Sequence, residues 1–241
     1  MKISVCIATY NGGKYIKAQL ESILPQLGSS DEVIVSDDSS SDNTIIEINS
    51  LKDPRIVILS DQKFRSAIFN FENAIKAASG DVIFLSDQDD IWTNDKVEKM
   101  MKWFPQFNLV VSDCFITDQN LHIIEDSMFK LNRSAPGIFR NSIKNAYLGC
   151  TMAFDRSVLN VALPFPKDIP MHDIWLGFVA NAFGKVKFIS DKLLYYRRHG
   201  DNTVQWQDGK IESVYSWKEK LSFRYITLKR LLLRKLLHWK K

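Results

Sequence analysis

The N-terminal third of the chain alternates short apolar runs with segments of helical spacing, and this alternation restricts the possible folds more than any other feature. The apolar runs are continuous and rich in Val and Ile, which is typical of strands buried on both faces of a parallel sheet. They occupy residues 3–8, 32–36, 55–59 and 82–86. Strand, helix and strand repeated at this spacing predict βαβ units with right-handed crossovers. We therefore expect an α/β fold around a mostly parallel sheet.

Helical patterns fill the gaps between these runs. Residues 15–24 carry apolar side chains at every third or fourth position and end before Pro25, because proline cannot continue the interior of a helix. Residues 39–44 are rich in N-cap residues, so a second helix is expected to follow them. A third helix is expected over residues 66–78.

The second half of the chain is less regular. The expected elements are a strand at 109–112, a hairpin at 118–124, a helix at 172–182 and strands at 186–189 and 193–197. The chain has 241 residues, 45% hydrophobic and 25% charged, which is enough for one sizeable α/β domain. This composition argues against a disordered chain and against a membrane-embedded bundle.

Three polar clusters stand where predicted strands end. They are Thr9-Tyr10-Asn11, Asp37-Asp38 and Asp87-Gln88-Asp89-Asp90. In an open α/β sheet, ligands bind outside the carboxyl ends of the strands. Since chance would scatter polar clusters over both ends of the sheet, their placement predicts one binding site built from three loops.

The third cluster is acidic enough to suggest a metal. Asp87, Asp89 and Asp90 would repel one another strongly unless they were solvated or bound to a cation. Carboxylate oxygens suit Mg²⁺ or Mn²⁺, which also take oxygens from substrate phosphates. The alternative interpretation is an ordinary acidic turn in which Asp90 only caps the next helix.

Several motifs in order resemble one enzyme family. The segments are VCIATYNGGKYI, VSDDSSSDNT, GDVIFLSDQDDIW, YLGCTMAF, MHDIWL and YRRHGDN, which together span the chain from Lys2 to about Asn202. They resemble the inverting family 2 glycosyltransferases with the GT-A fold, and more narrowly the bacterial DQDD-type, rhamnosyltransferase-like branch. The resemblance implies a Rossmann-like, mostly parallel sheet flanked by helices, and metal-dependent transfer of a sugar from a nucleotide donor.

The resemblance also implies roles for the donor side of the site. The loop after the first strand would line the nucleotide pocket, and Asp38 would accept a hydrogen bond from the base. Asp87 would contact the ribose or the water shell of the metal, with Gln88 beside it in the substrate site. Asp89 would ligate the Mg²⁺ or Mn²⁺ that bridges the diphosphate. His199 matches a position near the diphosphate that adds a metal ligand in some relatives.

On the acceptor side, Asp173 matches the catalytic base of the family. A carboxylate within hydrogen-bond reach can take the proton of an acceptor hydroxyl, and one base with attack from one face gives inversion without a covalent intermediate. The other candidates for substrate contact are Gly149, Cys150, His172, Trp175 and Arg197. Their alternative roles are core packing, a helix start, or a solvated loop.

The last residues form a basic amphipathic pattern. From 211 to 241 there are nine Lys or Arg and two Glu, a local charge of +7 in a chain of net charge +4. One helical stripe is apolar and carries Trp217, Leu221, Tyr225, Leu228, Leu232, Leu236 and Trp239. Such a helix fits a membrane interface; the alternative is a helix docked on the body or on a second subunit. No nucleic-acid-binding motif accompanies the charge, so nucleic acid is not expected as a partner.

These features lead to one expected function. We expect a GT-A domain over 1–205, with a nucleotide-sugar-binding half at 1–112 and an acceptor-binding half at 113–205, and a basic helix over 206–241. It would move a sugar from a UDP- or dTDP-sugar to a saccharide acceptor, possibly lipid-linked, in bacterial surface polysaccharide synthesis. The widely spaced cysteines and the absence of a visible secretory signal favour a cytoplasmic protein, peripheral on the inner leaflet.

Two other classes stay open on the sequence alone. A nucleotidyltransferase that makes sugar nucleotides also uses a parallel sheet and a carboxylate-held metal, but the loop TYNGGKY is poorer in glycine and basic residues than a triphosphate-binding loop of that class. A non-catalytic nucleotide-binding membrane adaptor is the other, and the presence of Asp87, Asp89 and Asp173 argues against it.

Overall fold

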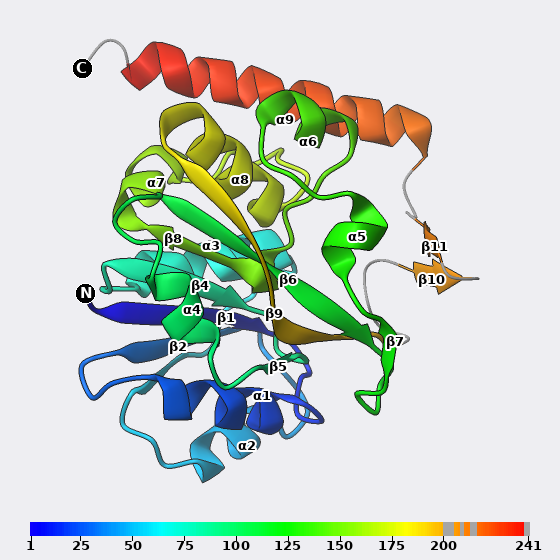
Figure 1. The fold of residues 1–241 in the computed structure, drawn as a ribbon. Helices are drawn as coiled ribbons and strands as arrows, with labels where there is room; N and C mark the ends of the chain where they lie inside the picture. Colours follow the sequence, from blue (N-terminus) through cyan, green and yellow to red (C-terminus); the bar gives the residue numbers. More distant parts are fainter. Residues whose placement is uncertain (200–204, 208–209, 213–215, 239–241) are drawn as a thin grey trace.

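The fold is built on one curled sheet with helices on both faces (Figure 1). The computed structural model describes residues 1–199, 205–207, 210–212 and 216–238. The strand order in the large sheet is β3-β2-β1-β4-β8-β6-β9-β5, and β7 pairs with β6. The strands are β1 (Ile3–Thr9), β2 (Glu32–Asp37), β3 (Ile56–Leu59), β4 (Val82–Ser86), β5 (Ile91–Trp92), β6 (Leu109–Thr117), β7 (Ile123–Glu125), β8 (Met152–Asp155) and β9 (Val186–Arg197). The fold class predicted from the sequence is confirmed.

The parallel half of the sheet lies at the N-terminus and follows the predicted βαβ pattern. β1 lies between β2 and β4, and β3 pairs with the far side of β2, all in parallel. The connecting helices are α1 (Ile16–Ile23), α2 (Thr44–Ser50) and α3 (Ala67–Ala77). Thr9 pairs with Asp37, and Ile7 pairs with Ser86. The three strands therefore end at the same edge, which brings the three polar loops together.

The other half of the sheet is mixed. β8 runs antiparallel to both of its neighbours, β4 and β6, whereas β6 and β9 are parallel. Two strands were predicted at 186–189 and 193–197, but the structure has one continuous strand, Val186–Arg197. The irregular pairing of β6 with β9 between Ser112 and Phe115 accounts for the break in the sequence pattern. The predicted division at residue 112 falls inside β6.

Among the described residues, six further helices follow β5 along the chain. They are α4 (Lys96–Met101), α5 (Met128–Asn132), α6 (Ile138–Ile143), α7 (Arg156–Ala162), α8 (His172–Phe183) and α9 (Trp217–His238). Short 3₁₀ turns occur at Leu24–Gln26 and Gly149–Thr151, and β10 (Gln205–Gln207) pairs with β11 (Lys210–Glu212). The sequence analysis predicted α8 but not α5, α6 or α7, which are too short for a clear apolar period.

Two apolar cores lie on the two faces of the sheet. Along β1, Val5 and Ile7 belong to one core and Cys6 to the other. This alternation follows from the period of two in a strand. Because both faces of the central strands are buried, those strands read as continuous apolar runs in the sequence.

Helix α9 packs on α8, at the edge farthest from α2 (Figure 1). Its inward side buries Thr227 and Leu231, and Arg230 pairs with Asp168 at 2.7 Å. Most of the apolar stripe predicted from the sequence faces outward, as the exposed Leu221, Tyr225, Leu232 and Leu236 show. Leu228 of that stripe packs against the core, and Trp239 lies outside the described residues. Among the described helices, none is both long and apolar enough to cross a membrane.

Candidate active site

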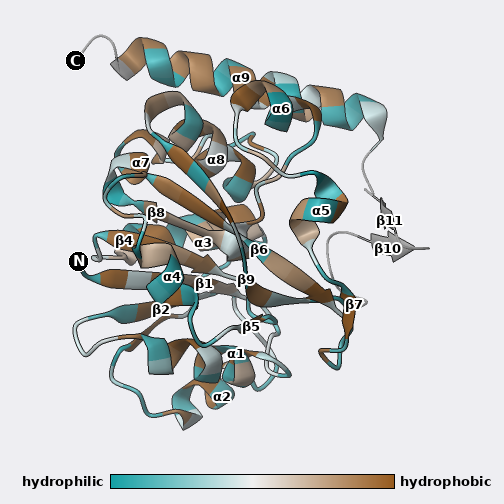
Figure 2. Cartoon of the chain, in the orientation of Figure 1, coloured by the Kyte–Doolittle hydropathy of each residue, from teal (hydrophilic) through white to brown (hydrophobic). Residues whose placement is uncertain are grey.

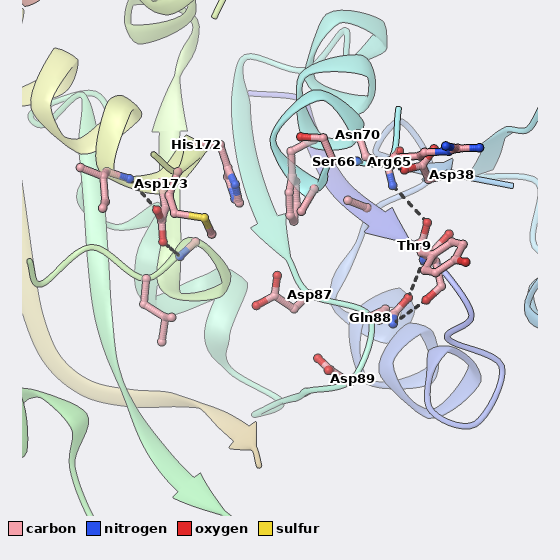
Figure 3. A pocket seen from close by; sticks show the side chains of 18 of the residues that line it. Thr9, Asp38, Arg65, Ser66, Asn70, Asp87, Gln88, Asp89, His172 and Asp173 are labelled. Atoms are coloured by element: carbon pink, nitrogen blue, oxygen red, sulfur yellow. Dashed lines mark hydrogen bonds between the residues drawn. The ribbon is translucent and has the colours of Figure 1, made fainter. Parts of the chain in front are cut away.

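The three polar loops border one cavity at the carboxyl edge of the parallel strands. Its volume is about 1080 Å³. Figure 3 shows Asp87 between Asp173 and His172 on one side and Thr9 and Gln88 on the other. The predicted site residues that line it are Thr9, Tyr10, Asp38, Asp87, Gln88, Asp89, Gly149, His172 and Asp173. The acidic loop and Asp173, which are far apart in sequence, therefore face the same space.

The first loop is fixed by the buried end of β1. Thr9 donates its hydroxyl hydrogen to Asp37 at 2.9 Å, and its carbonyl accepts a hydrogen bond from the Asn70 side chain at 3.0 Å. Within the described part of the chain, the side-chain amide oxygen of Asn70 has no hydrogen-bond partner. Asn70 also lines the cavity, so this buried oxygen lies in its wall.

Gln88 ties the acidic loop to the first loop. Its amide oxygen accepts a hydrogen bond from the Tyr10 N–H at 3.0 Å, and its amide nitrogen donates to the Tyr10 carbonyl at 3.2 Å. A β-carbon at Gly12 would lie 2.4 Å from that amide oxygen. A side chain at position 12 would therefore displace the Gln88 amide from these two hydrogen bonds.

Asn11 serves the loop rather than the cavity. Its side-chain oxygen accepts a hydrogen bond from the Ser41 N–H at 2.8 Å, and its own N–H donates to the Ser40 hydroxyl at 2.8 Å. It adopts a left-handed backbone with φ 49°, which asparagine tolerates better than most residues. Asn11 therefore holds the 38–42 loop in place and does not line the cavity.

The Asp38 carboxylate is held by the segment that leads into α3. It accepts backbone hydrogen bonds from Phe64 at 2.5 Å and from Ser66 at 3.3 Å. Two cationic residues of that segment, Lys63 and Arg65, line the same end of the cavity. The sequence analysis did not select them, although they follow the predicted third strand, where ligand-binding loops are expected.

The carboxylates of the acidic loop have different surroundings. The Asp89 carboxylate is hydrogen-bonded to His199, whose Nε2 lies 2.7 Å away. Asp90 is fully buried and accepts a hydrogen bond from the Arg197 N–H at 2.9 Å. The side chain of Asp87 is half-buried and lines the cavity. Asp87 and Asp89 thus face the cavity, while Asp90 anchors the loop to β9.

Burial and mutual repulsion disfavour ionisation of this loop. Burial, then the nearby charges of Asp89 and Asp173, raises the pKa of Asp87 to about 7. Burial also lowers the pKa of Lys96, which is fully buried on α4, to about 8. The Lys96 ammonium donates to the Cys150 carbonyl at 2.5 Å and lies 4.3 Å from the centre of the Trp92 ring. The sequence analysis did not identify this internal cation, which partly offsets the negative loop.

The donor set fits a hard divalent cation. Carboxylate oxygens of Asp87 and Asp90 and the Cys150 sulfur lie within 4.8 Å of one another. Within the described residues, one oxygen of the buried Asp90 carboxylate has no hydrogen-bond partner. Burial raises the pKa of the Cys150 thiol well above its usual value, so the sulfur is a protonated, poor ligand. The carboxylates, together with the Asp89–His199 pair, are the groups suited to Mg²⁺ or Mn²⁺.

Asp173 stands in the first turn of α8, on the opposite wall of the cavity. Its carboxylate accepts hydrogen bonds from the Ile174 N–H at 2.6 Å and from the Gly149 N–H at 3.3 Å. Burial raises its pKa to about 6 in spite of these two bonds. At neutral pH the group is ionised and still basic enough to take a proton, as a general base requires.

His172 presents an unusual buried ring beside this base. It stacks on Phe71, with ring centres 4.1 Å apart, and burial lowers its pKa to about 3. In the part of the chain that the structure describes, neither ring nitrogen has a hydrogen-bond partner. A β-carbon at Gly149 would lie 3.1 Å from its Nε2. The neutral ring therefore lies in the wall of the cavity with two buried nitrogens, both unpaired within the described residues.

Five predicted substrate contacts lie outside the cavity lining, and Asn11 and His199 are two of them. Trp175 is fully buried, and its ring N–H donates to the Ala162 carbonyl at 3.0 Å. This places the ring in the core, because α8 turns this face toward α7 and away from the cavity. Cys150 is also fully buried, next to Asp87 and Asp90.

Arg197 is the fifth, and it supports the acidic loop from behind. Its Nε donates to the Asp89 carbonyl at 2.7 Å, and its guanidinium lies 4.8 Å from the centre of the Tyr15 ring. Tyr15 also stacks on His199, with ring centres 5.2 Å apart. Asn202, at the end of the same motif, lies outside the described residues.

Replacing Asp87 by asparagine is expected to stabilise the metal-free protein. A carboxyl whose pKa is raised on folding destabilises the fold once it ionises, so the penalty grows from about its ordinary pKa of 3.8 and is complete above about pH 7. Removing a penalty on the order of 1–3 kcal/mol should raise Tm by roughly 2–10 °C. Thermal melting in chelator at neutral and acidic pH measures this, with Glu98→Gln on the surface of α4 as the control.

The expected gain disappears at low pH, where Asp87 is protonated in the folded and the unfolded chain. A lower Tm for Asp87→Asn at every pH would contradict this account, because the carboxylate would then stabilise the loop.

Comparisons with known proteins point to one family. Residues 4–161 match the family described as Glycosyl transferase family 2. The chain is 32% identical over 231 residues to the UDP-Glc:alpha-D-GlcNAc-diphosphoundecaprenol beta-1,3-glucosyltransferase WfgD of Escherichia coli, with 88% of this chain and 89% of WfgD covered. It is 30% identical over 214 residues to the dTDP-rhamnosyl transferase RfbG of Shigella flexneri, with 82% and 73% covered.

Solved structures share the fold. TarS 1–349 of Staphylococcus aureus in complex with UDP-GlcNAc has a TM-score of 0.71 and 19% identity, and the mannosyltransferase PcManGT of Pyrobaculum calidifontis in complex with GDP-Man and Mn²⁺ has 0.61 and 19%. They cover 97% and 95% of this chain, which spans only 66% and 64% of theirs. The motifs, the fold and the relatives agree: the chain belongs to glycosyl transferase family 2 and is a GT-A glycosyltransferase.

Proposed function

We propose that the protein moves a sugar from a UDP- or dTDP-sugar to a hydroxyl of a lipid-linked saccharide, with inversion, during synthesis of a bacterial surface polysaccharide. The observation that carries the proposal is the single cavity bordered by Asp87, Asp89 and Asp173. The relatives supply its substrate classes: WfgD is named for a UDP-glucose donor and a diphosphoundecaprenol-linked acceptor, and RfbG for dTDP-rhamnosyl transfer.

The two ends of the cavity suit different substrates. At one end, Asp38, Lys63 and Arg65 offer an acceptor of hydrogen bonds and two cations, which fits a base and a diphosphate. At the other end, Tyr147 and Met171 add apolar surface beside Asp173. We accordingly assign residues 1–112 to the donor and 113–205 to the acceptor.

The transfer step follows from these positions. Asp173 takes the proton of the acceptor hydroxyl as its oxygen forms a bond to the anomeric carbon of the sugar. The bond from that carbon to the diphosphate breaks on the opposite face, and its electron pair goes to the diphosphate oxygen. Asp89, with Asp87 and His199, would hold the divalent cation, which when bound stabilises negative charge on the diphosphate.

A donor screen tests the proposal. UDP-glucose or dTDP-rhamnose with Mn²⁺ should raise Tm, because a ligand at 100 times its Kd adds about 2.7 kcal/mol to the folded state. GDP-mannose serves as the comparison nucleotide. The donor that raises Tm should then be transferred to GlcNAc-diphosphoundecaprenol or a related lipid-linked acceptor. A protein whose Tm responds to no UDP- or dTDP-sugar would contradict the proposal.

The proposal includes a location at the cytoplasmic face of the membrane, through α9. The outward stripe of this helix exposes Leu221, Tyr225, Leu232 and Leu236 by 50%, 66%, 62% and 60%. Hydrophobic and hydrophilic segments alternate along the helix in Figure 2. Exposed apolar side chains next to Lys and Arg are typical of helices that lie in a membrane interface. Such a location would bring the enzyme to a lipid-linked acceptor.

A further inference from the structure

Helix α6 carries a second exposed apolar surface. Phe139 and Ile143 are one helical turn apart and are 81% and 60% exposed. Arg140 and Lys144, the residues that follow each of them, are exposed as well. The short helix thus presents two large apolar side chains and two cations to the outside, an arrangement that costs free energy in water.

This orientation is fixed by the inner side of α6. The buried Asn141 donates to the carbonyls of Ala135 and Gly137 at 2.9 Å each, and its oxygen accepts a hydrogen bond from the Ala146 N–H at 2.8 Å. Turning Phe139 inward would rotate Asn141 outward and break this set of bonds. The outward apolar face therefore belongs to the folded state.

Helix α6 adjoins α9. The Arg224 guanidinium of α9 donates to the Ile143 carbonyl, the last residue of α6, at 2.6 Å, and the two helices lie together at the same end of the molecule in Figure 1. Two exposed apolar side chains of α9 lie near Arg224: Leu221 about one turn before it and Tyr225 directly after it. We define the α6–α9 face by eight of the exposed side chains of α6, of the residue after it and of the N-terminal half of α9. They are Phe139, Arg140, Ile143, Lys144, Lys218, Leu221, Tyr225 and Lys229.

We propose that the α6–α9 face docks on an anionic lipid bilayer and that α6 inserts Phe139 and Ile143 beside the stripe of α9. The proposal rests on the membrane location proposed above and extends it to α6. Arg140, Lys144, Lys218 and Lys229 are interspersed with the apolar side chains of this face and complement anionic headgroups.

The place of α6 in the chain adds a reason. It ends at Ile143, and Asn145 and Tyr147 shortly after it line the cavity. On the other side, Asp168 pairs with Arg230 of α9, and Met171 just after it also lines the cavity. Both docking helices are thus connected to the acceptor wall near Asp173. Helix α6 is connected through the chain, and α9 through the ion pair of Arg230 with Asp168. Docking through them would set that wall close to the lipid headgroups.

Vesicle flotation of the full chain tests the inference. The vesicles are made of phosphatidylethanolamine with phosphatidylglycerol, and phosphatidylcholine vesicles report the dependence on charge. Phe139→Ser/Ile143→Ser is expected to lower the partition coefficient by at least about tenfold, because each side chain loses the free energy of apolar burial. Ile46→Ser is the matched control for Ile143→Ser: Ile46 is 69% exposed on α2, at the opposite end of the molecule. It should leave partitioning unchanged.

Leu221→Ser/Tyr225→Ser on α9 separates this inference from the proposed function. Loss of flotation in the α9 variant with wild-type flotation in the α6 variant would overturn the role of α6 and leave the location through α9 standing. A wild-type chain that does not float with anionic vesicles would overturn both. A wild-type dimer that becomes monomeric in Phe139→Ser/Ile143→Ser would make the face a subunit interface and overturn the inference. Unchanged Tm values show that the variants fold.

Discussion

Asp173→Asn is expected to lose ~10²- to 10⁴-fold of the transfer rate, the usual contribution of a general base. Asparagine has nearly the same shape, and its side-chain oxygen can still accept the hydrogen bond that Ile174 or Gly149 donates to Asp173. The donor should therefore bind with nearly unchanged affinity. Transfer measured with a radiolabelled donor, beside donor binding by calorimetry, separates the two effects.

The control is Glu98→Gln, the same kind of change on an exposed side chain of α4. It should leave transfer unchanged. For the wild type, the rate should fall as pH drops below about 6, because Asp173 is then protonated and can no longer accept a proton. An Asp173→Asn enzyme with most of its activity would remove Asp173 from the role of base.

The second large effect is expected for Asp89→Ala, in the binding of metal and donor together. Asp89 faces the cavity beside His199, so its removal takes away a charged ligand and leaves the imidazole without this partner. Metal and nucleotide affinities should fall in parallel, each by at least about tenfold. Isothermal titration with Mn²⁺ alone, with the nucleotide alone and with both together measures the coupling.

Glu98→Ala is the matched control, and its Mn²⁺ affinity should equal that of the wild type. If Asp89→Ala binds Mn²⁺ normally, the ion is held elsewhere, and among the described residues the cluster of Asp87, Asp90 and Cys150 offers possible ligands. Cys150→Ser would then show whether the sulfur takes part.

The sequence predicted the parallel half of the sheet and the meeting of its three loops, because period, strand ends and loop polarity are local properties of the chain. Thr9, Asp38 and Asp87 could be found in this way. The cavity-facing position of Asp173 was predicted from family resemblance, since nothing local relates residue 173 to residue 87. The role that each of these residues plays in the reaction stays a prediction.

Other features depend on tertiary packing. Lys96 stands among other charged residues of α4, and only the fold places its ammonium against Trp92 and the Cys150 carbonyl. Trp175 has an aromatic ring of the kind that stacks on sugars, but the ring points into the core. The outward direction of the stripe on α9 also could not be predicted, because amphipathic spacing defines a face without saying what covers it.

The antiparallel strand β8 has a consequence for the order of folding during synthesis. β4 is buried along its whole length, and its second edge is completed only by Met152–Asp155. A ribosome has therefore made some seventy further residues before that edge can pair. Until then an apolar strand with free hydrogen-bonding groups is open to other chains. We therefore expect the nascent chain to be prone to aggregation until β8 has been made.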